Sequence, residues 1–187
     1  EACLLSSTLG MELAKKYNTR FHILHITTQE EARMFDAGPI KNKRITSEAC
    51  AHHLYFSDQD YITLGNQIKC NPAIKTEADR DAIIQAVLDD RIDIIASDHA
   101  PHTWEEKGEV YKNAASGLPL VQHTLQIMLT HWKEGRISLE RIIEKMCHAP
   151  AECFNIVGRG YLEEGYFADI VLLDLERDTT VSKENIL

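Results

Sequence analysis

Histidine is the residue type best placed to do chemistry in this sequence, which has 187 residues and nine histidines. Six of them form three close pairs, each at or just beyond the C-terminal end of a predicted strand: His22 with His25, His52 with His53, and His99 with His102. In α/β proteins the carboxyl ends of the strands form the edge at which sites are built. The three pairs therefore predict a site at one edge of a sheet.

Strand geometry selects one candidate from each predicted strand. Side chains alternate between the two faces of a strand, so the histidines of the first pair point in opposite directions, as do those of the second. Asp98 and His99 separate in the same way. The natural set is His25, His52 and Asp98, because each ends its strand where a loop begins. Two imidazoles and a carboxylate from separate strands can hold Zn²⁺ or a similar divalent cation and leave room for water.

Each candidate also has an ordinary structural interpretation. A lone histidine at a strand end is usually a hydrogen-bonded structural residue. Asp98 could cap a helix or form a loop turn, and Asn71 before Pro72 could simply begin a turn. Three further histidines lie on predicted helices, where we interpret them as surface or packing residues: His123, His131 and His148.

A thiol nucleophile is the competing chemistry, because Cys50 lies two residues before His52. The two side chains share a strand face, but no third group is evident to orient them, so we disfavour this interpretation. The sequence also lacks the G-x-G-x-x-G, P-loop and G-x-S-x-G motifs. Metal binding is therefore the favoured chemistry.

Alternating helices and strands must position these residues. The predicted strands span residues 20–27, 44–51, 66–70, 91–97 and 168–174. Predicted helices cover residues 1–17 and 120–132, and others begin after Thr28, Thr76 and Ser138, with a polar loop over residues 103–116. The separation of His25 from His52 fits one βα unit, and that of His52 from Asp98 fits two, with the strand at 66–70 between them.

This alternation predicts a parallel α/β fold for residues 1–157. After Gly158 the alternation of helices and strands gives way to a turn-rich segment and an isolated strand, so we interpret residues 158–187 as the start of a separate small β domain. The chain begins at Glu1 inside a predicted helix and ends just past a strand-like run. We therefore expect it to be a piece of a longer protein.

Composition excludes several classes of function. The net charge is −9 and no basic run stands out, which argues against a nucleic-acid-binding face. No stretch of 18 apolar residues occurs, so we expect no membrane span. The five cysteines include no C-x-x-C pair, which is typical of a reducing compartment. These features predict a cytoplasmic protein.

Several motifs resemble those of one family. Residues 96–102 (ASDHAPH) resemble the strand-eight signature of the cyclic amidohydrolases, above all of the dihydroorotases. Residues 71–80 (NPAIKTEADR) resemble the N-P-P-L-R segment of that family, and residues 48–54 (EACAHHL) resemble its strand-six segment. Residues 22–27 and 165–174 are similar to strand five and to the returning strand of the small β domain. The likeness runs in order over nearly the whole chain.

The resemblance implies a fold and a metal centre. The fold would be a (β/α)₈ TIM barrel of the amidohydrolase type, of which this chain would hold strands five to eight and part of the small β domain. His25 and His52 would ligate one metal of a binuclear zinc centre, and Asp98 would ligate the other and act as catalytic base and acid. The H-x-H of strand one, the arginine after it and the carboxylate of strand four are absent, and we expect them upstream of Glu1.

The resemblance also implies a substrate and a reaction. Asn71 and His102 would bind the substrate, and the backbone around Gly117 and Leu118 would contact a pyrimidine ring. The reaction would be the reversible closure of N-carbamoyl-L-aspartate to L-dihydroorotate in pyrimidine biosynthesis. A metal-activated hydroxide would attack the ring carbonyl in the hydrolytic direction. Residues 103–116 would order over the substrate.

Two other functions remain open from the sequence. The chain could belong to a hydantoinase or an allantoinase, although Asn71 and His102 favour a substrate carboxylate. It could also belong to a non-catalytic subunit that binds an aspartate transcarbamoylase, because half of the metal ligands are absent. We expect the isolated chain to be inactive and to associate, either with itself or with the missing half of the barrel.

Overall fold

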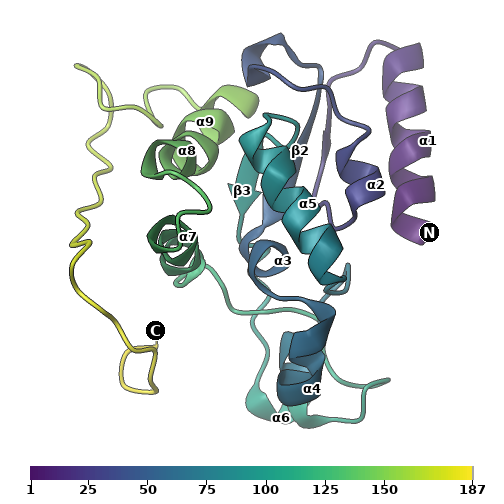
Figure 1. Cartoon of the computed structure of the whole chain (residues 1–187). Coiled ribbons are helices and arrows are strands. Elements are labelled where there is room, and N and C mark those ends of the chain that lie inside the picture. The colour runs from purple at the N-terminus through teal and green to yellow at the C-terminus, as the bar shows by residue number, and fades with distance from the viewer. Residues whose placement is uncertain (187) are drawn as a thin grey trace.

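A parallel three-stranded sheet forms the centre of the computed structural model, which describes residues 1–186. The sheet contains β1 (Phe21–Ile23), β2 (Ile45–Cys50) and β3 (Ile94–Ala96) in that order (Figure 1). Helices separate the strands along the chain, because parallel neighbours need a crossover connection. The predicted parallel α/β architecture is therefore confirmed for this part of the chain.

The strand predicted at residues 66–70 is wrong. Gly65–Ile68 forms a 3₁₀-helix, η3, and β2 pairs directly with β3. Ile68 and Cys70 instead pack against Leu118 and Leu120 in a small apolar cluster. One βα unit, not two, consequently separates His52 from Asp98.

The helices on the N-terminal side begin where the sequence predicts. α2 (Gln29–Ala32) and α5 (Glu77–Leu88) follow Thr28 and Thr76, whose hydroxyls accept hydrogen bonds from backbone N–H groups three residues on. Such caps satisfy donors that the first turn of a helix leaves unpaired. The other elements before β3 are α1 (Ala2–Lys16), η1 (Ile40–Asn42), α3 (Ala51–Tyr55), η2 (Asp58–Asp60) and α4 (Tyr61–Leu64).

The last four helical elements after β3 lie together on one side of the sheet (Figure 1). They are α7 (Thr124–Lys133), α8 (Leu139–Ile143), the π-helical turn η4 (Glu144–His148) and α9 (Ala149–Cys153). Ser138 caps α8 as predicted. The predicted loop at 103–116 contains a short helix, α6 (Trp104–Gly108), which a Thr103–Glu106 capping box begins. That prediction therefore missed one element.

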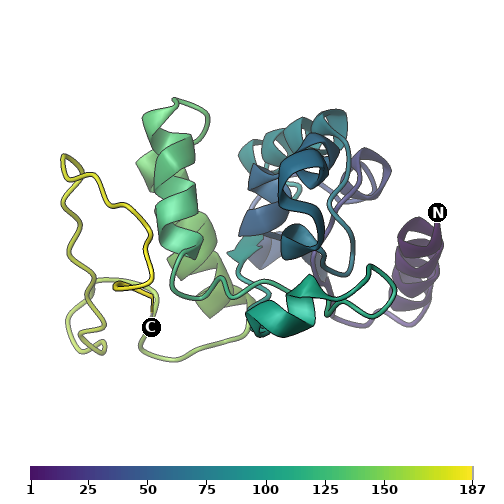
Figure 2. The same cartoon turned by 90° about the horizontal axis from the view of Figure 1, so that it is seen from below.

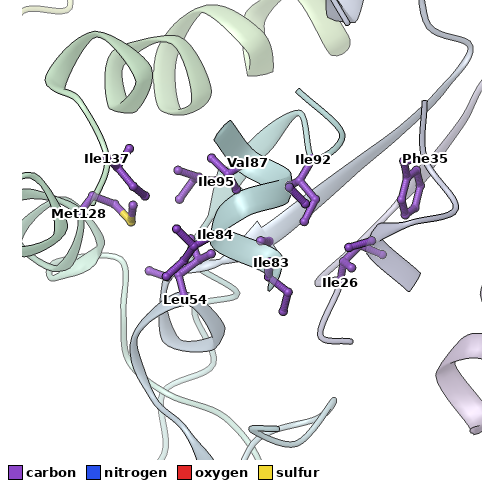
Figure 3. Packing of buried hydrophobic residues seen from close by; sticks show 14 of the residues in the cluster. Ile26, Phe35, Leu54, Ile83, Ile84, Val87, Ile92, Ile95, Met128 and Ile137 are labelled. Carbon is purple, nitrogen blue, oxygen red and sulfur yellow. The ribbon is translucent and has the colours of Figure 1, made fainter. Parts of the chain in front are cut away.

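The main core lies between the sheet and the helices around it, with α5 at its centre (Figure 3). Ile83 and Val87 of α5 meet Ile95 of β3, and Met128 of α7 and Leu54 of α3 close the same cluster. All five side chains are buried. The spacing of Ile83 and Val87 is the helical i, i+4 period that puts apolar residues on one face. This packing holds the strands, and with them the strand ends, in a fixed arrangement.

Residues 158–186 contain no helix or strand, so the strand predicted at 168–174 is wrong for this structure. They run as an extended trace on the outer side of α7–α9 (Figure 2). Ile170, Val171 and Leu172 are exposed, and no strand of the described residues pairs with them. An apolar strand needs a partner to bond its backbone groups. A search of the described residues for a helix long and apolar enough to cross a membrane finds none.

Candidate metal centre

The candidate ligands His25, His52 and Asp98 follow the three strands at the same sequence separation. Each lies two residues beyond the last residue of its strand. The strands are parallel and β2 lies in the middle, so their carboxyl ends form one edge with His52 between the other two. Cys50 and Ala96, the last residues of β2 and β3, are paired in register. The segment around His25 stays beside β2, because Ile26 donates its N–H to the Glu48 carbonyl.

The backbone at His25 and Asp98 is in a conformation that residues other than glycine rarely adopt. Their φ angles are 41° and 44°, in the left-handed region. A non-glycine residue there costs about 1 to 3 kcal/mol and is held by its surroundings, often at functional sites. Both residues lie two positions beyond strands of the central sheet. The strained positions therefore coincide with the predicted ligand positions at this edge.

His52 is the most deeply placed of the three. Its exposed fraction is 0%, and neither ring nitrogen has a hydrogen-bond partner among the described residues. Burial and, to a smaller extent, the nearby His25 together lower the pKa of His52 to about 4. The imidazole is thus neutral, with a nitrogen lone pair that no protein group uses. An unpaired buried polar atom is costly, so this ring fits a role as a metal ligand.

The companion histidines of the three pairs are bonded to the protein. Nδ1 of His22 lies 2.8 Å from the Thr46 hydroxyl, and its Nε2 lies 3.1 Å from the Glu48 carboxylate. Nδ1 of His99 accepts a hydrogen bond from the N–H of Val121 at 3.0 Å. Hydrogen bonding to the protein is the structural role that a lone histidine usually has.

The turn that carries Asn71 is held by the other member of the second pair. Nε2 of His53 donates to the Pro72 carbonyl at 2.9 Å, and the Cys70 thiol donates to the same oxygen at 3.1 Å. Asn71 itself is exposed. The amide is therefore presented to solvent from a turn that is anchored on both sides.

The segments of Asp98, His102 and Gly117 lie against one another. Ala100 donates its N–H to the Leu118 carbonyl at 3.0 Å, and residues 99 and 118 form a parallel bridge. Gly117 has no room for a side chain, because a Cβ there would lie 2.5 Å from Cβ of Ala100. Its N–H donates to the Lys69 carbonyl at 2.9 Å. The structure thus brings residues 69–71, 98–102 and 117–118 together.

His102 is exposed and paired with a residue of α6. Its Nδ1 lies 3.3 Å from the Glu106 carboxylate, which also caps α6. The backbone N–H of Thr103 and the nearby His102 hold the pKa of the Glu106 carboxyl below its usual range. The ring therefore stands next to an ionised carboxylate at the start of α6.

Lys107 is a positioning residue that sequence reasoning missed. Although it is a lysine, its exposed fraction is only 5%. Its ammonium donates to the carbonyls of Lys69 at 2.8 Å, Ala115 at 3.1 Å and Gly117 at 2.9 Å. Burial lowers the pKa of Lys107. The only sequence signal was its place in the helical turn that follows the Thr103 capping box.

A thiol nucleophile at Cys50 is not supported. Burial raises the pKa of the Cys50 thiol far above its ordinary value, and the negative charges of Glu48 and Asp98 raise it further. A nucleophilic cysteine needs a positive neighbour that stabilises the thiolate. The environment of Cys50 does the opposite.

Comparisons with known proteins identify the family of this chain. Residues 11–186 match the family described as the amidohydrolase family. A dihydroorotase of Bacillus subtilis (strain 168) is 38% identical over 176 residues, which is 94% of this chain and 41% of the relative. A dihydroorotase of Bacillus pumilus (strain SAFR-032) is 36% identical over the same shares. The chain thus spans about two fifths of the length of these relatives.

Solved structures show the same fold. An L-hydantoinase (dihydropyrimidinase) from Arthrobacter aurescens superimposes with a TM-score of 0.86 at 26% identity, over 95% of this chain and 41% of the other. A dihydroorotase from Saccharomyces cerevisiae in complex with 5-fluoroorotic acid gives 0.70 at 17% identity, over 78% of this chain and 41% of the other. At 17% identity the second likeness supports the fold alone.

Proposed function

Because the chain belongs to the amidohydrolase family, we propose that it supplies part of the barrel and active site of a dihydroorotase. The reaction is the reversible closure of N-carbamoyl-L-aspartate to L-dihydroorotate. One observation carries the proposal: three potential ligands end neighbouring parallel strands in a chain that is 36 to 38% identical to proteins named dihydroorotase. The sheet would be one arc of a (β/α)₈ barrel, followed from residue 158 by the start of a small β domain.

His25 and His52 are the proposed ligands of one divalent metal, and Asp98 is the proposed ligand of a second. The unpaired ring nitrogens of His52 and the neighbouring His25 support a cation here. Imidazole and carboxylate suit zinc, which we propose as the metal. A metal bound here would supply a water of lowered pKa and would polarise the carbonyl of the substrate.

Asp98 is the proposed base and acid. In the hydrolytic direction its carboxylate takes a proton from the attacking water and delivers it to the ring nitrogen as the C–N bond breaks. In the direction of ring closure, the same carboxylate removes the proton from that nitrogen. Its position at the sheet edge, in a constrained backbone conformation, supports a fixed distance to the reacting atoms.

The substrate carboxylate and ring are proposed to bind beside this edge. Asn71 offers an amide N–H₂ group and His102 offers a ring N–H group, both of which can donate to a carboxylate. The backbone at Gly117 and Leu118 would contact the ring. The network of Lys107 supports this assignment, because it ties the carbonyls of residues 69 and 117 to one ammonium.

A hydantoinase is the second candidate, because the L-hydantoinase superimposes on 95% of this chain. Its lower identity of 26%, against 38% for a dihydroorotase, favours the first candidate. The two functions differ in the substrate carboxylate, which a simple hydantoin lacks. Donors at Asn71 and His102 would be left without a partner by such a ring.

A substrate panel tests the proposal. The longer protein that carries this chain is loaded with Zn²⁺ and assayed with L-dihydroorotate, hydantoin and allantoin. We expect turnover of dihydroorotate above the other two, and its loss in Asp98→Asn and in His52→Ala. Preferred turnover of hydantoin, or full activity and metal content in His52→Ala, would contradict the proposal.

A further inference from the structure

A group of three donors beside the proposed metal centre is not explained by the proposed reaction. It contains Cys50, His52 and His53, which are all buried, and one ligand atom from each lies within 4.8 Å of the others. The group spans the junction between β2 and α3. Only His52 has a part in the proposed function.

The surroundings of His53 prepare one of its nitrogens for a metal. Because Nε2–H donates to the Pro72 carbonyl, the lone pair of the ring lies on Nδ1. Nδ1 is buried and has no hydrogen-bond partner among the described residues. A ring N–H bonded to a backbone carbonyl is the usual support for a metal-ligating histidine.

The three donors lie near enough to one another to bind one ion after a small movement. The rings of His52 and His53 have centroids 4.0 Å apart and are tilted by 49°. Ligands of one tetrahedral ion lie about 3.5 Å from one another when the bonds are of ordinary length, so the donors must approach by about 1 Å. Side-chain rotations can supply such a movement.

We propose that Cys50, His52 and His53 form a second metal site, selective for soft ions, which competes with the proposed centre for His52. A thiolate with two imidazoles suits a soft ion such as Cu⁺ or Cd²⁺ better than an ion that prefers oxygen ligands. On binding, the S–H bond of Cys50 breaks, a bond from sulfur to the metal forms, and the proton leaves to solvent. An ion held here occupies His52 and leaves His25 without its partner ligand.

Cadmium titration of the metal-free 187-residue chain tests this site. Cd²⁺ alone is the probe, and a thiolate–Cd²⁺ charge-transfer band in the ultraviolet is the readout. We expect the band in the unmodified chain and its loss in Cys50→Ser, with Cd²⁺ binding weakened about tenfold or more. Circular dichroism checks that the variant is folded. Persistence of the band in folded Cys50→Ser would overturn the proposal.

Two matched variants locate the ion. Cys70→Ser removes a second buried thiol, whose sulfur lies 3.8 Å from Nε2 of His53 but outside the donor group, and it should keep the band. His25→Ala should also keep the band, although it would remove a ligand of the proposed zinc centre. Loss of the band in either variant would show that the ion is bound elsewhere and would overturn the proposal.

X-ray absorption of the unmodified chain decides the question even if Cys50→Ser does not fold. At the cadmium edge we expect one sulfur and at least two nitrogen neighbours. A shell without sulfur would overturn the proposal. Failure of the soft-metal site leaves the dihydroorotase assay unaffected, and an absence of dihydroorotase activity leaves the cadmium spectrum unaffected, so the two proposals fail separately.

Discussion

At the scale of single residues, the roles of the six paired histidines differ by what their nitrogens contact. His22 uses both nitrogens for protein partners, whereas His52 uses neither among the described residues. The period-two rule predicted that the members of the first two pairs point in opposite directions, but His52 and His53 lie in α3 with their ring centroids 4.0 Å apart, so the rule does not apply to them. It could not foresee that Thr46 and Glu48, one strand away, would occupy the ring of His22. Such partners are set by the pairing of strands, which the sequence does not state.

Zinc content should follow His52 and not His22. Both variants are made in a Cys50→Ser background, which removes the competing soft-metal site. In this background we expect His52→Ala to lose most of the zinc that the chain binds. His22→Ala in the same background is the control and should retain zinc, because its ring is bonded to Thr46 and Glu48. Atomic absorption after dialysis measures both. Equal zinc in the two variants would contradict the assignment of His52.

The buried ring of His131 should make stability depend on pH. Burial first, and then the charge of Arg136, lowers its pKa below 6.5, so the folded chain holds the neutral ring. Below pH 6.5 the unfolded chain takes up a proton that the folded chain does not, and the free energy of unfolding falls as the pH falls. His131→Leu should flatten this dependence. Urea unfolding on either side of pH 6.5 measures it, and an unchanged slope would contradict the assignment.

At the scale of elements, the sequence predicted where helices begin better than it predicted which segments pair as strands. The caps at Thr28, Thr76 and Ser138 were readable because a helix start depends on residues three apart. The strands predicted at 66–70 and 168–174 were wrong because apolar β-formers only become a strand beside a partner. Residues 66–70 pack into a small apolar cluster instead. Residues 168–174 have no neighbouring strand among the described residues.

The buried ammonium in α6 should be needed for the loop that it holds. Lys107→Met keeps the length of the side chain but leaves three carbonyls without their donor, so we expect the free energy of unfolding to fall by about 3 kcal/mol. Lys112→Met, at an exposed lysine of the same loop, is the control and should change little. Chemical denaturation compares the two. Similar stabilities for both variants would contradict this role.

The close approach of Gly117 to Ala100 should tolerate no methyl group. Its φ is 154°, and an added Cβ would lie 2.6 Å from the Ala100 carbonyl oxygen. We expect Gly117→Ala to lower the free energy of unfolding by about 2 kcal/mol, because backbone must move. Gly108→Ala is the matched control, since nothing lies within 4 Å of its Cβ position. Thermal unfolding of both variants tests this, and equal midpoints would argue against the contact.

At the scale of the whole molecule, the fold leaves apolar surface uncovered. Leu5, Leu9 and Leu13 are spaced by one helical turn on α1, and the first two have exposed fractions of 71% and 58%. β1 and β3 are the edges of the described sheet. Open edges and apolar stripes favour association. The sequence suggested this outcome through its resemblance to a full barrel, whereas composition alone did not.

The isolated chain should therefore self-associate, and its associated fraction should rise with protein concentration. Replacing Leu5 and Leu9 together by lysine should reduce the association, because it puts charge on the apolar face of α1. Ile62→Lys, at an exposed residue of α4, is the control and should change it little. Sedimentation velocity over a range of concentrations measures the effect. A monodisperse monomer at every concentration would contradict the prediction.

His25 and His52 should share one metal ion at the carboxyl edge of the sheet. Zinc anomalous scattering from crystals grown with Zn²⁺ measures this directly. We expect a difference peak bonded to one ring nitrogen of each histidine, at about 2.0 to 2.1 Å. A zinc peak that contacts His52 without His25, or the lack of any peak at this edge, would rule out a metal ion shared by these two histidines.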